Sequence, residues 1–145
     1  MKVVTQWKQK MFFVADAEGH SVPMDAKAPI GTNEAATPKE LLLAAVCGCS
    51  GMDVAGLLKK HKQPVDELTI EAEAKNREGF PATFAELTLT FRLSGAIDRA
   101  VLVEAVRLSQ SKYCSVSAML SKAVPVSYKT ILNSELVDSG LANFE

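Results

Sequence analysis

The sequence is poor in cysteine and in net charge. Its three cysteines are an odd number and too few for the disulfide framework of a small secreted domain. A formal net charge of −1 gives no general electrostatic reason to expect nucleic acid or an anionic membrane as a partner. With 48% hydrophobic and 23% charged residues, the composition is that of an ordinary soluble protein. The cysteines are therefore packing residues, metal ligands or reactive thiols.

Long apolar segments are missing as well. No stretch approaches the roughly 18 uncharged apolar residues that a membrane span requires, and residues 1–8 lack the apolar run of a secretory signal. We therefore predict a cytoplasmic protein without a membrane partner. A chain of 145 residues suits a single domain over residues 1–145. We place its core at about residues 1–132 and a C-terminal tail at residues 133–145.

The first part of the chain is typical of short strands. Residues 2–7 and 11–14 are rich in β-branched and aromatic types and predict a first pair of strands. A turn at Asp16–Gly19 leads into a short strand around residues 20–24, and residues 25–36 predict a loop because they show no periodicity.

The clearest boundary in the sequence is a helix start at Thr37. Thr37 suits the N-cap, Pro38 the first helical position and Glu40 the third, so that Thr37 and Glu40 form a capping box. The helix is predicted from Leu41 to about His61 and is stopped by Pro64.

This helix is hydrophobic on all sides in its first turns, which predicts a long buried central helix. One surface of it consists mostly of small residues, which let another helix cross closely: Ala44, Ala45, Gly48, Cys49, Met52 and Ala55. We infer a tight helix–helix contact, with a sheet on one side of the helix and a partner subunit on the other. The protein is therefore predicted to be a homodimer.

The second half predicts strands, then helices, then a final strand. Residues 68–75 and 87–94 alternate apolar and polar types, as an antiparallel pair with one buried face does. Asp98 suits the N-cap of a helix over about residues 99–111. A short helix and a strand follow, at about 115–123 and at 125–131, and residues 133–145 give no clear pattern. This order predicts an α+β fold with an antiparallel sheet.

Cys49 stands out because Asp53 follows four residues later, on the same face of the predicted helix. A buried carboxylate needs a partner. Asp53 could orient a base or a thiol, or it could cap a local break in the glycine-rich stretch, and we favour the cap. Cys47 points to a different helix face from Cys49 and is interpreted as a packing residue.

Cys114 lies at the junction of two predicted helices. A helix N-terminus lowers the pKa of a thiol, and Lys112 adds to that effect, so physical grounds alone favour Cys114 as the thiolate. The alternative is a half-buried junction cysteine. His20 and the three cysteines lack any spacing typical of a metal site, and we predict neither a metal nor a cofactor.

Taken together, these segments resemble the OsmC/Ohr superfamily of thiol-dependent peroxidases. The matching residues are 38–45 leading into 48–54, and the block at 108–116. With Gly19-His20 and Met24-Asp25 near the start, the match is to the OsmC-like branch of uncharacterised redox proteins, over roughly residues 1–132.

The resemblance implies an intertwined, strand-swapped homodimer in which two central helices cross. It also implies that Cys49 is the peroxidatic cysteine and Cys114 the resolving one. Cys49 would reduce a small organic hydroperoxide and become a sulfenic acid, Cys114 would close a disulfide, and a dithiol would reduce it. The expected function is thus a peroxiredoxin-like hydroperoxide reductase of the stress response. The alternative is a non-catalytic dimer that uses the same interface pocket to bind an apolar ligand or to sense redox state.

Two positions depart from the well-studied peroxidases that this chain resembles. Those proteins hold the thiolate with an arginine of the N-terminal region, whereas the first arginine here is Arg77. They place a glutamate ten residues before the reactive cysteine, where this chain has Lys39. The adjacent Glu40 has a sufficient role in the capping box. Lys39, or His20 from a swapped strand, is therefore the candidate cation beside Cys49.

Overall fold

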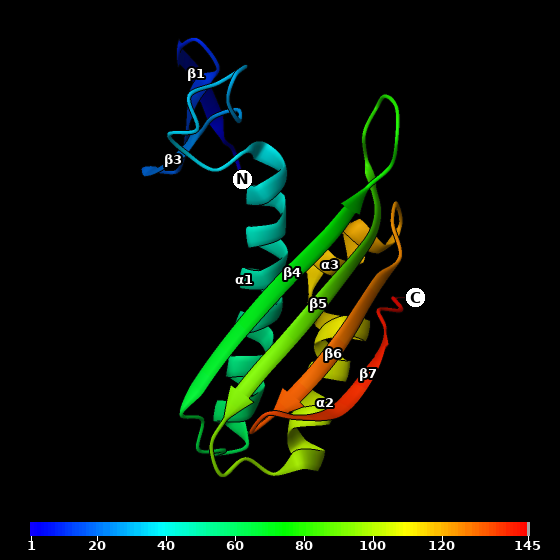
Figure 1. Cartoon of the computed structure of the whole chain (residues 1–145). Helices are drawn as coiled ribbons and strands as arrows, with labels where there is room; N and C mark the ends of the chain where they lie inside the picture. Colours follow the sequence, from blue (N-terminus) through cyan, green and yellow to red (C-terminus); the bar gives the residue numbers. More distant parts are fainter. Residues whose placement is uncertain (145) are drawn as a thin grey trace. The chain divides into compact units, whose positions relative to one another are not determined.

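Helix α1 (Pro38–Lys60) runs through the boundary between two units of the chain (Figure 1). The structure is a computed structural model that describes residues 1–144. Its first unit is Met1–Leu43, and the second begins at Ala44. The described residues form two sheets and three α-helices, which is the mixed α+β class predicted above. The single domain over residues 1–145 stays a prediction.

The first unit contains a three-stranded antiparallel sheet, as the strand-rich sequence predicted. The strands are β1 (Val4–Gln9), β2 (Phe12–Ala17) and β3 (His20–Met24), in the order β1-β2-β3. Every residue of β1 is exposed within the chain, including Trp7 at 63%. The sheet therefore has an uncovered edge strand that carries a large aromatic side chain.

The loop that follows β3 is organised by the buried carboxylate of Asp25. This carboxylate accepts hydrogen bonds from the N–H groups of Ala26, Thr32 and Glu34 and from the Thr32 hydroxyl, at 2.7–3.1 Å. The hydrogen bond from Glu34, followed by those from Thr32 and Ala26, lowers the pKa of Asp25 to about 2 against the opposing effect of burial. A Cβ on Gly31 would collide with the Ala26 carbonyl oxygen and lie 2.6 Å from Asp25 Oδ1. This close approach requires glycine.

The start of α1 confirms the predicted capping box. The Thr37 N–H donates to Glu40 Oε2 at 2.7 Å, and the Glu40 N–H donates to Thr37 Oγ1 at 3.3 Å. Lys27 Nζ lies 3.0 Å from Glu40 Oε1. These contacts, with the Thr37 N–H first, hold the pKa of Glu40 at about 2.

Within the chain, α1 is buried on one face only. Its buried residues are spaced four apart and pack into the second unit: Val46, Ser50, Val54 and Leu58. On other faces Met52 is 78% exposed, and a Cβ on Gly48 or Gly56 would meet nothing within 4 Å. The predicted burial on all sides is therefore not reached inside one chain, because its own sheet and helices cover only one side of α1.

The expectation that no stretch approaches a membrane span was wrong for α1, which among residues 1–144 is the one helix long and apolar enough to cross a membrane by length and composition. Asp53 is the single charged residue between Leu41 and Leu58. The core helix of a soluble protein meets the same criterion, and the buried row of α1 packs as such a helix does. This property alone does not indicate a membrane protein.

The second unit contains a mixed four-stranded sheet. Its strands are β4 (Glu67–Asn76), β5 (Phe84–Ser94), β6 (Val126–Leu132) and β7 (Glu135–Leu141), in the order β4-β5-β6-β7. The β4–β5 pair is antiparallel as predicted, but β5 and β6 run parallel. The prediction of an antiparallel sheet was wrong at this pair because the helical segment between the two strands returns the chain to the same end of the sheet.

Three consecutive helical segments form this crossover. Helix α2 (Arg99–Leu108) begins at the predicted N-cap Asp98, which accepts the Val101 N–H at 3.1 Å. A π-helical turn, η1 (Ser109–Tyr113), replaces the end of the predicted α-helix, and α3 (Ser115–Ser121) follows. The helices lie behind the sheet in the view of Figure 1. The core between them contains Val54, Leu58, Leu87, Leu89, Phe91, Leu102 and Val106.

Strand β7 lies in residues 133–145, where no clear pattern was found in the sequence. Arg107 of α2 makes a two-pronged ion pair with Asp138, at 2.8 and 3.0 Å. Arg99 donates to the Val137 carbonyl at 3.2 Å. The strand is thus held by β6 on one side and by two arginines of α2, contacts that depend on residues distant in the sequence.

Candidate active site: two thiols at a helix junction

The structure brings Cys49 and Cys114 together from separate helices. Cys49 lies in α1, and Cys114 is the N-cap residue of α3, where its sulfur accepts the Ser117 N–H at 3.3 Å. Cys49 is partly exposed, with its sulfur 3.9 Å from the Ser115 hydroxyl, whereas Cys114 is fully buried. All three cysteines are free thiols.

The environment of Cys49 favours its thiolate. Burial raises the pKa of this thiol, but hydrogen bonds from the Val116 N–H, the Cys114 thiol and the Ser115 hydroxyl lower it by more. Asp53 opposes them slightly through its negative charge. The net result is a pKa below the ordinary value for cysteine. A partly exposed thiol with a lowered pKa is the type of cysteine that reacts with electrophiles.

Cys114 has the opposite character. Its predicted position at a helix N-terminus is confirmed, but the predicted lowering of its pKa is wrong. Burial raises the pKa of Cys114 to about 11, and the hydrogen bonds from Ser50 and Ser117 offset only part of that effect. Lys112 does not supply the expected cation, because its ammonium lies over the Tyr113 ring, 5.6 Å from the centroid. The first turn of α3 instead lowers the pKa of Cys49, through the hydrogen bonds from Val116 and Ser115.

A set of buried polar side chains surrounds Cys114. The Ser50 hydroxyl donates to Cys114 Sγ at 3.2 Å, and Gln110 Nε2 donates to Ser50 Oγ at 2.9 Å. Ser109 and Ser117 complete the set, at 3.2 and 2.7 Å from the Gln110 amide. Sequence reasoning missed these four residues. One signal was available: Ser50 lies four residues from Val46 and from Val54, and so falls on the apolar, core-facing row of the helix.

Asp53 contacts this set through Ser109, whose hydroxyl donates to Asp53 Oδ2 at 3.0 Å. Burial raises the pKa of Asp53, and the hydrogen bond from Ser109 reduces the effect. The alternative that Asp53 caps a break in the helix was wrong, because α1 is continuous from Pro38 to Lys60. The carboxylate instead orients the Ser109 hydroxyl.

The other predicted site residues belong to the first unit. His20 is exposed on β3, and Glu40 is held by the capping box and Lys27. Lys39 lines an open groove of about 470 Å³, whose lining includes Met11, Phe13 and Met24. Roles for His20, Lys39 and Glu40 beside the thiolate stay predictions.

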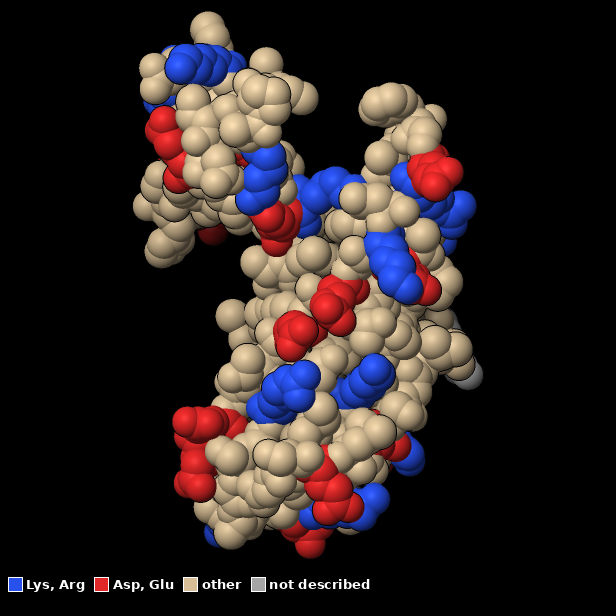
Figure 2. Space-filling view, viewed as in Figure 1, with Lys and Arg blue, Asp and Glu red and all other residues tan. Residues whose placement is uncertain are grey.

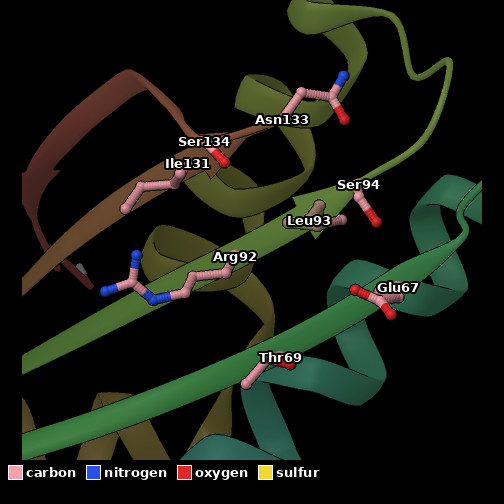
Figure 3. Close-up of a pocket in the computed structure, with 8 residues that line it drawn as sticks. All are labelled: Glu67, Thr69, Arg92, Leu93, Ser94, Ile131, Asn133 and Ser134. Atoms are coloured by element: carbon pink, nitrogen blue, oxygen red, sulfur yellow. The ribbon is translucent and has the colours of Figure 1, made fainter.

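Other surface features of the described chain do not add a second reactive centre. No group of three His, Cys, Asp or Glu side chains in residues 1–144 lies close enough to hold a metal ion. The outer face of the second unit's sheet carries acidic and basic side chains interspersed (Figure 2). A shallow hollow of about 340 Å³ lies there, lined by residues of β4, β5 and β6 that include Thr69, Arg92 and Ile131 (Figure 3).

Comparisons with known proteins agree with this fold. Residues 31–129 match the family model described as OsmC-like protein. Protein YhfA of Escherichia coli strain K12 is 34% identical over 130 residues, which cover 88% of this chain and 95% of that protein.

Two solved structures show the same fold. A hypothetical protein from Aquifex aeolicus VF5 is 30% identical, with a TM-score of 0.77, and the match covers 91% of this chain and 96% of that one. An organic hydroperoxide resistance protein from Elizabethkingia anophelis is 14% identical, with a TM-score of 0.70 and coverage of 92% and 97%. At that identity the second match supports the fold alone.

These findings define an α+β protein of the OsmC/Ohr superfamily, as the sequence resemblance predicted. More particularly, the chain belongs to the OsmC-like family.

Proposed function

We propose that the protein is a thiol-dependent peroxidase that reduces organic hydroperoxides. The observation that carries this proposal is the pairing of a partly exposed Cys49, whose pKa is lowered, with the buried thiol of Cys114. One protein that shares this fold is named for organic hydroperoxide resistance, the chemistry proposed here.

In the first step the Cys49 thiolate attacks one oxygen of the hydroperoxide. A sulfur–oxygen bond forms as the O–O bond breaks, so that Cys49 is oxidised to a sulfenic acid and the peroxide is reduced to an alcohol. The leaving alkoxide takes up one proton. The lowered pKa of Cys49 raises the population of the attacking thiolate at neutral pH.

In the second step the Cys114 sulfur attacks the sulfenic sulfur of Cys49. A disulfide forms, and the hydroxyl group leaves as water with the proton of the Cys114 thiol. A dithiol reductant then exchanges with the disulfide, which returns both cysteines to thiols and leaves the reductant oxidised. The raised pKa of Cys114 keeps this residue protonated until the first step has occurred.

We further propose that two chains form an intertwined homodimer through the exposed small-residue face of α1. Gly48 and Gly56 open onto empty space, and the apolar Met52 beside them is 78% exposed. A second copy of α1 would bury these residues and, with the exposed strand β1 exchanged between chains, would wall the entrance to Cys49 with apolar groups. Such walls favour an organic hydroperoxide over hydrogen peroxide.

A second candidate is a non-catalytic dimer that binds an apolar ligand or senses redox state at the same interface. One observation favours it. The described residues that lower the pKa of Cys49 do so by hydrogen bonds, and the charged group acting on this thiol is the anionic Asp53. A thiolate without a cation beside it is less stabilised than one paired with arginine or lysine.

The decisive experiment is the intact mass of the reduced protein after one equivalent of an organic hydroperoxide. We expect the loss of two hydrogens, mapped by peptide analysis to a Cys49–Cys114 bridge, followed by turnover when a dithiol is supplied. Cys49→Ser should abolish both, and Cys114→Ser should stop at the sulfenic acid. Cys47→Ser is the matched control, because Cys47 lies two residues from Cys49 and should leave both intact.

An unchanged mass with three titratable thiols would contradict the peroxidase and favour the ligand-binding dimer. A disulfide that forms without turnover would favour the redox sensor. We propose a cytoplasmic location and a role in stress response for either form of thiol chemistry, because disulfides that cycle need a reducing compartment.

A further inference from the structure

The buried polar residues beside Cys114 form a chain of hydrogen bonds whose direction is fixed at one end. That end is Asp53, because the oxygens of an ionised carboxylate only accept hydrogen bonds. The Ser109 hydroxyl donates to Asp53 Oδ2 at 3.0 Å. A hydroxyl has one hydrogen, so Ser109 Oγ offers only a lone pair to its next neighbour, Gln110.

The amide of Gln110 is oriented by this requirement. Its nitrogen must face Ser109, at 3.2 Å, and the second hydrogen of the same NH₂ group points to Ser50 Oγ, at 2.9 Å. The amide oxygen then lies on the opposite side, where it accepts the Ser117 hydroxyl at 2.7 Å. Gln110 is 1% exposed, so bulk solvent does not reach these positions.

Ser50 continues the same donor-to-acceptor order from Gln110 to the two cysteines. Because Ser50 Oγ accepts from Gln110, its hydrogen is directed to Cys114 Sγ at 3.2 Å. The Ser117 N–H donates to the same sulfur at 3.3 Å. With its lone pairs occupied, Cys114 has its own hydrogen left to donate, and a hydrogen bond from this thiol is one of the contacts that lower the pKa of Cys49.

We propose that Gln110 and Ser50 are positioning residues that decide which of the two thiols carries the proton. They hold Cys114 as the hydrogen-bond donor and Cys49 as the acceptor, so the hydroperoxide meets a thiolate at Cys49. This inference rests on the proposed function in its choice of the two reacting cysteines, and it adds the residues that assign their order. Successive donors in one direction strengthen one another in a buried site, so the loss of one link weakens the whole chain.

The test is the pH dependence of alkylation at each cysteine of the reduced protein, measured with iodoacetamide and peptide mapping. Ser50→Ala removes the donor to Cys114, and Gln110→Met removes the amide at similar volume. In each variant we expect the midpoint for Cys49 to rise by about one pH unit, and its alkylation at neutral pH to slow by about tenfold. Ser121→Ala is the control, because the Ser121 hydroxyl donates to the Ala118 carbonyl of its own helix and should leave the midpoint unchanged.

An unchanged Cys49 midpoint in a folded Ser50→Ala protein would overturn the inference. Alanine suits the interior of α1, so this variant decides the question even where Gln110→Met fails to fold. The alkylation measurement needs no peroxide. If the wild-type protein fails to turn over hydroperoxide while both variants raise the Cys49 midpoint, the peroxidase proposal is contradicted. The positioning role of Gln110 and Ser50 is then still supported.

Discussion

Ser50 donates a hydrogen bond to the sulfur of Cys114 over 3.2 Å, and this contact joins α1 to the start of α3. Ser50 lies on the buried face of α1, one residue after the partly exposed Cys49. The Cys114 thiol is thereby fixed against the helix that carries the proposed reactive thiol. Packing of α1 against the π-turn and α3, rather than closeness in sequence, determines the pairing of the two cysteines.

The first prediction concerns the hydrogen bond that the Cys114 thiol donates to Cys49. Cys114→Ala removes one of the donors that lower the pKa of Cys49, so this pKa should rise toward its ordinary value. At neutral pH a smaller fraction of Cys49 would be thiolate. The alkylation rate of Cys49 should therefore fall several-fold, by up to about tenfold relative to wild type. The measurement is the rate of iodoacetamide labelling as a function of pH, with Cys47→Ala as the control. A midpoint that stays in place would show that Cys114 does not stabilise the thiolate.

Asp25 gives a prediction about pH and folding. Its pKa is about 2 in the folded protein and 3.8 as the ordinary value, so the folded state binds the proton less readily. Its contribution to stability is complete above the ordinary pKa and is lost as the pH falls through the folded value. Asp25→Asn should therefore lower the free energy of unfolding at neutral pH, and the difference from wild type should shrink toward pH 2.

Urea unfolding at several pH values measures that difference. Asp16→Asn is a suitable control, because Asp16 is exposed and accepts a single hydrogen bond, from the Gly19 N–H at 3.3 Å. A constant gap between Asp25→Asn and wild type from neutral to acid pH would show that the carboxylate charge is not what holds the loop.

Gly31 carries the third prediction, again within the first unit. A Cβ at this position would collide with the Ala26 carbonyl oxygen and crowd Asp25 Oδ1. Gly31→Ala should destabilise the protein by about 1–3 kcal/mol, since backbone atoms must move to admit the methyl group. Thermal unfolding followed by circular dichroism would measure it. Gly56→Ala is the matched control and should be neutral or stabilising by up to about 1 kcal/mol, because its Cβ meets nothing and alanine favours the helix.

Local signals in the sequence predicted most elements of this fold. The capping box at Thr37 and Glu40, the N-cap at Asp98 and the alternating strands β4 and β5 each depend on neighbouring residues, and each is confirmed. The parallel pairing of β5 with β6 and the existence of β7 depend on contacts between distant segments. No local pattern encodes such contacts.

The candidate site likewise has features that the sequence predicts and features that depend on contacts between distant segments. The two cysteines could be found from sequence, but the order of their ionisation could not. A helix N-terminus was expected to lower the pKa of Cys114, whereas burial outweighs that effect and the first turn of α3 acts on Cys49. Gln110 was missed because its role requires three hydroxyl groups from two helical segments and the π-turn to converge on one amide.

Gly48 gives the last prediction, which concerns the proposed dimer. A Cβ on Gly48 meets no atom within 4 Å of the same chain, so Gly48→Leu should leave the fold of a single chain intact, and leucine is the better helix former. In a crossing of two α1 helices the same side chain would hold the helices apart. We therefore expect wild type to behave as a dimer in sedimentation equilibrium and Gly48→Leu to dissociate, with a circular dichroism spectrum that still shows α1. Glu71→Leu, on the outer face of the sheet, is the control for added apolar surface and should remain dimeric. A monomeric wild-type protein would contradict the proposed dimer, and a Gly48→Leu variant that stays dimeric would place the dimer interface on another face.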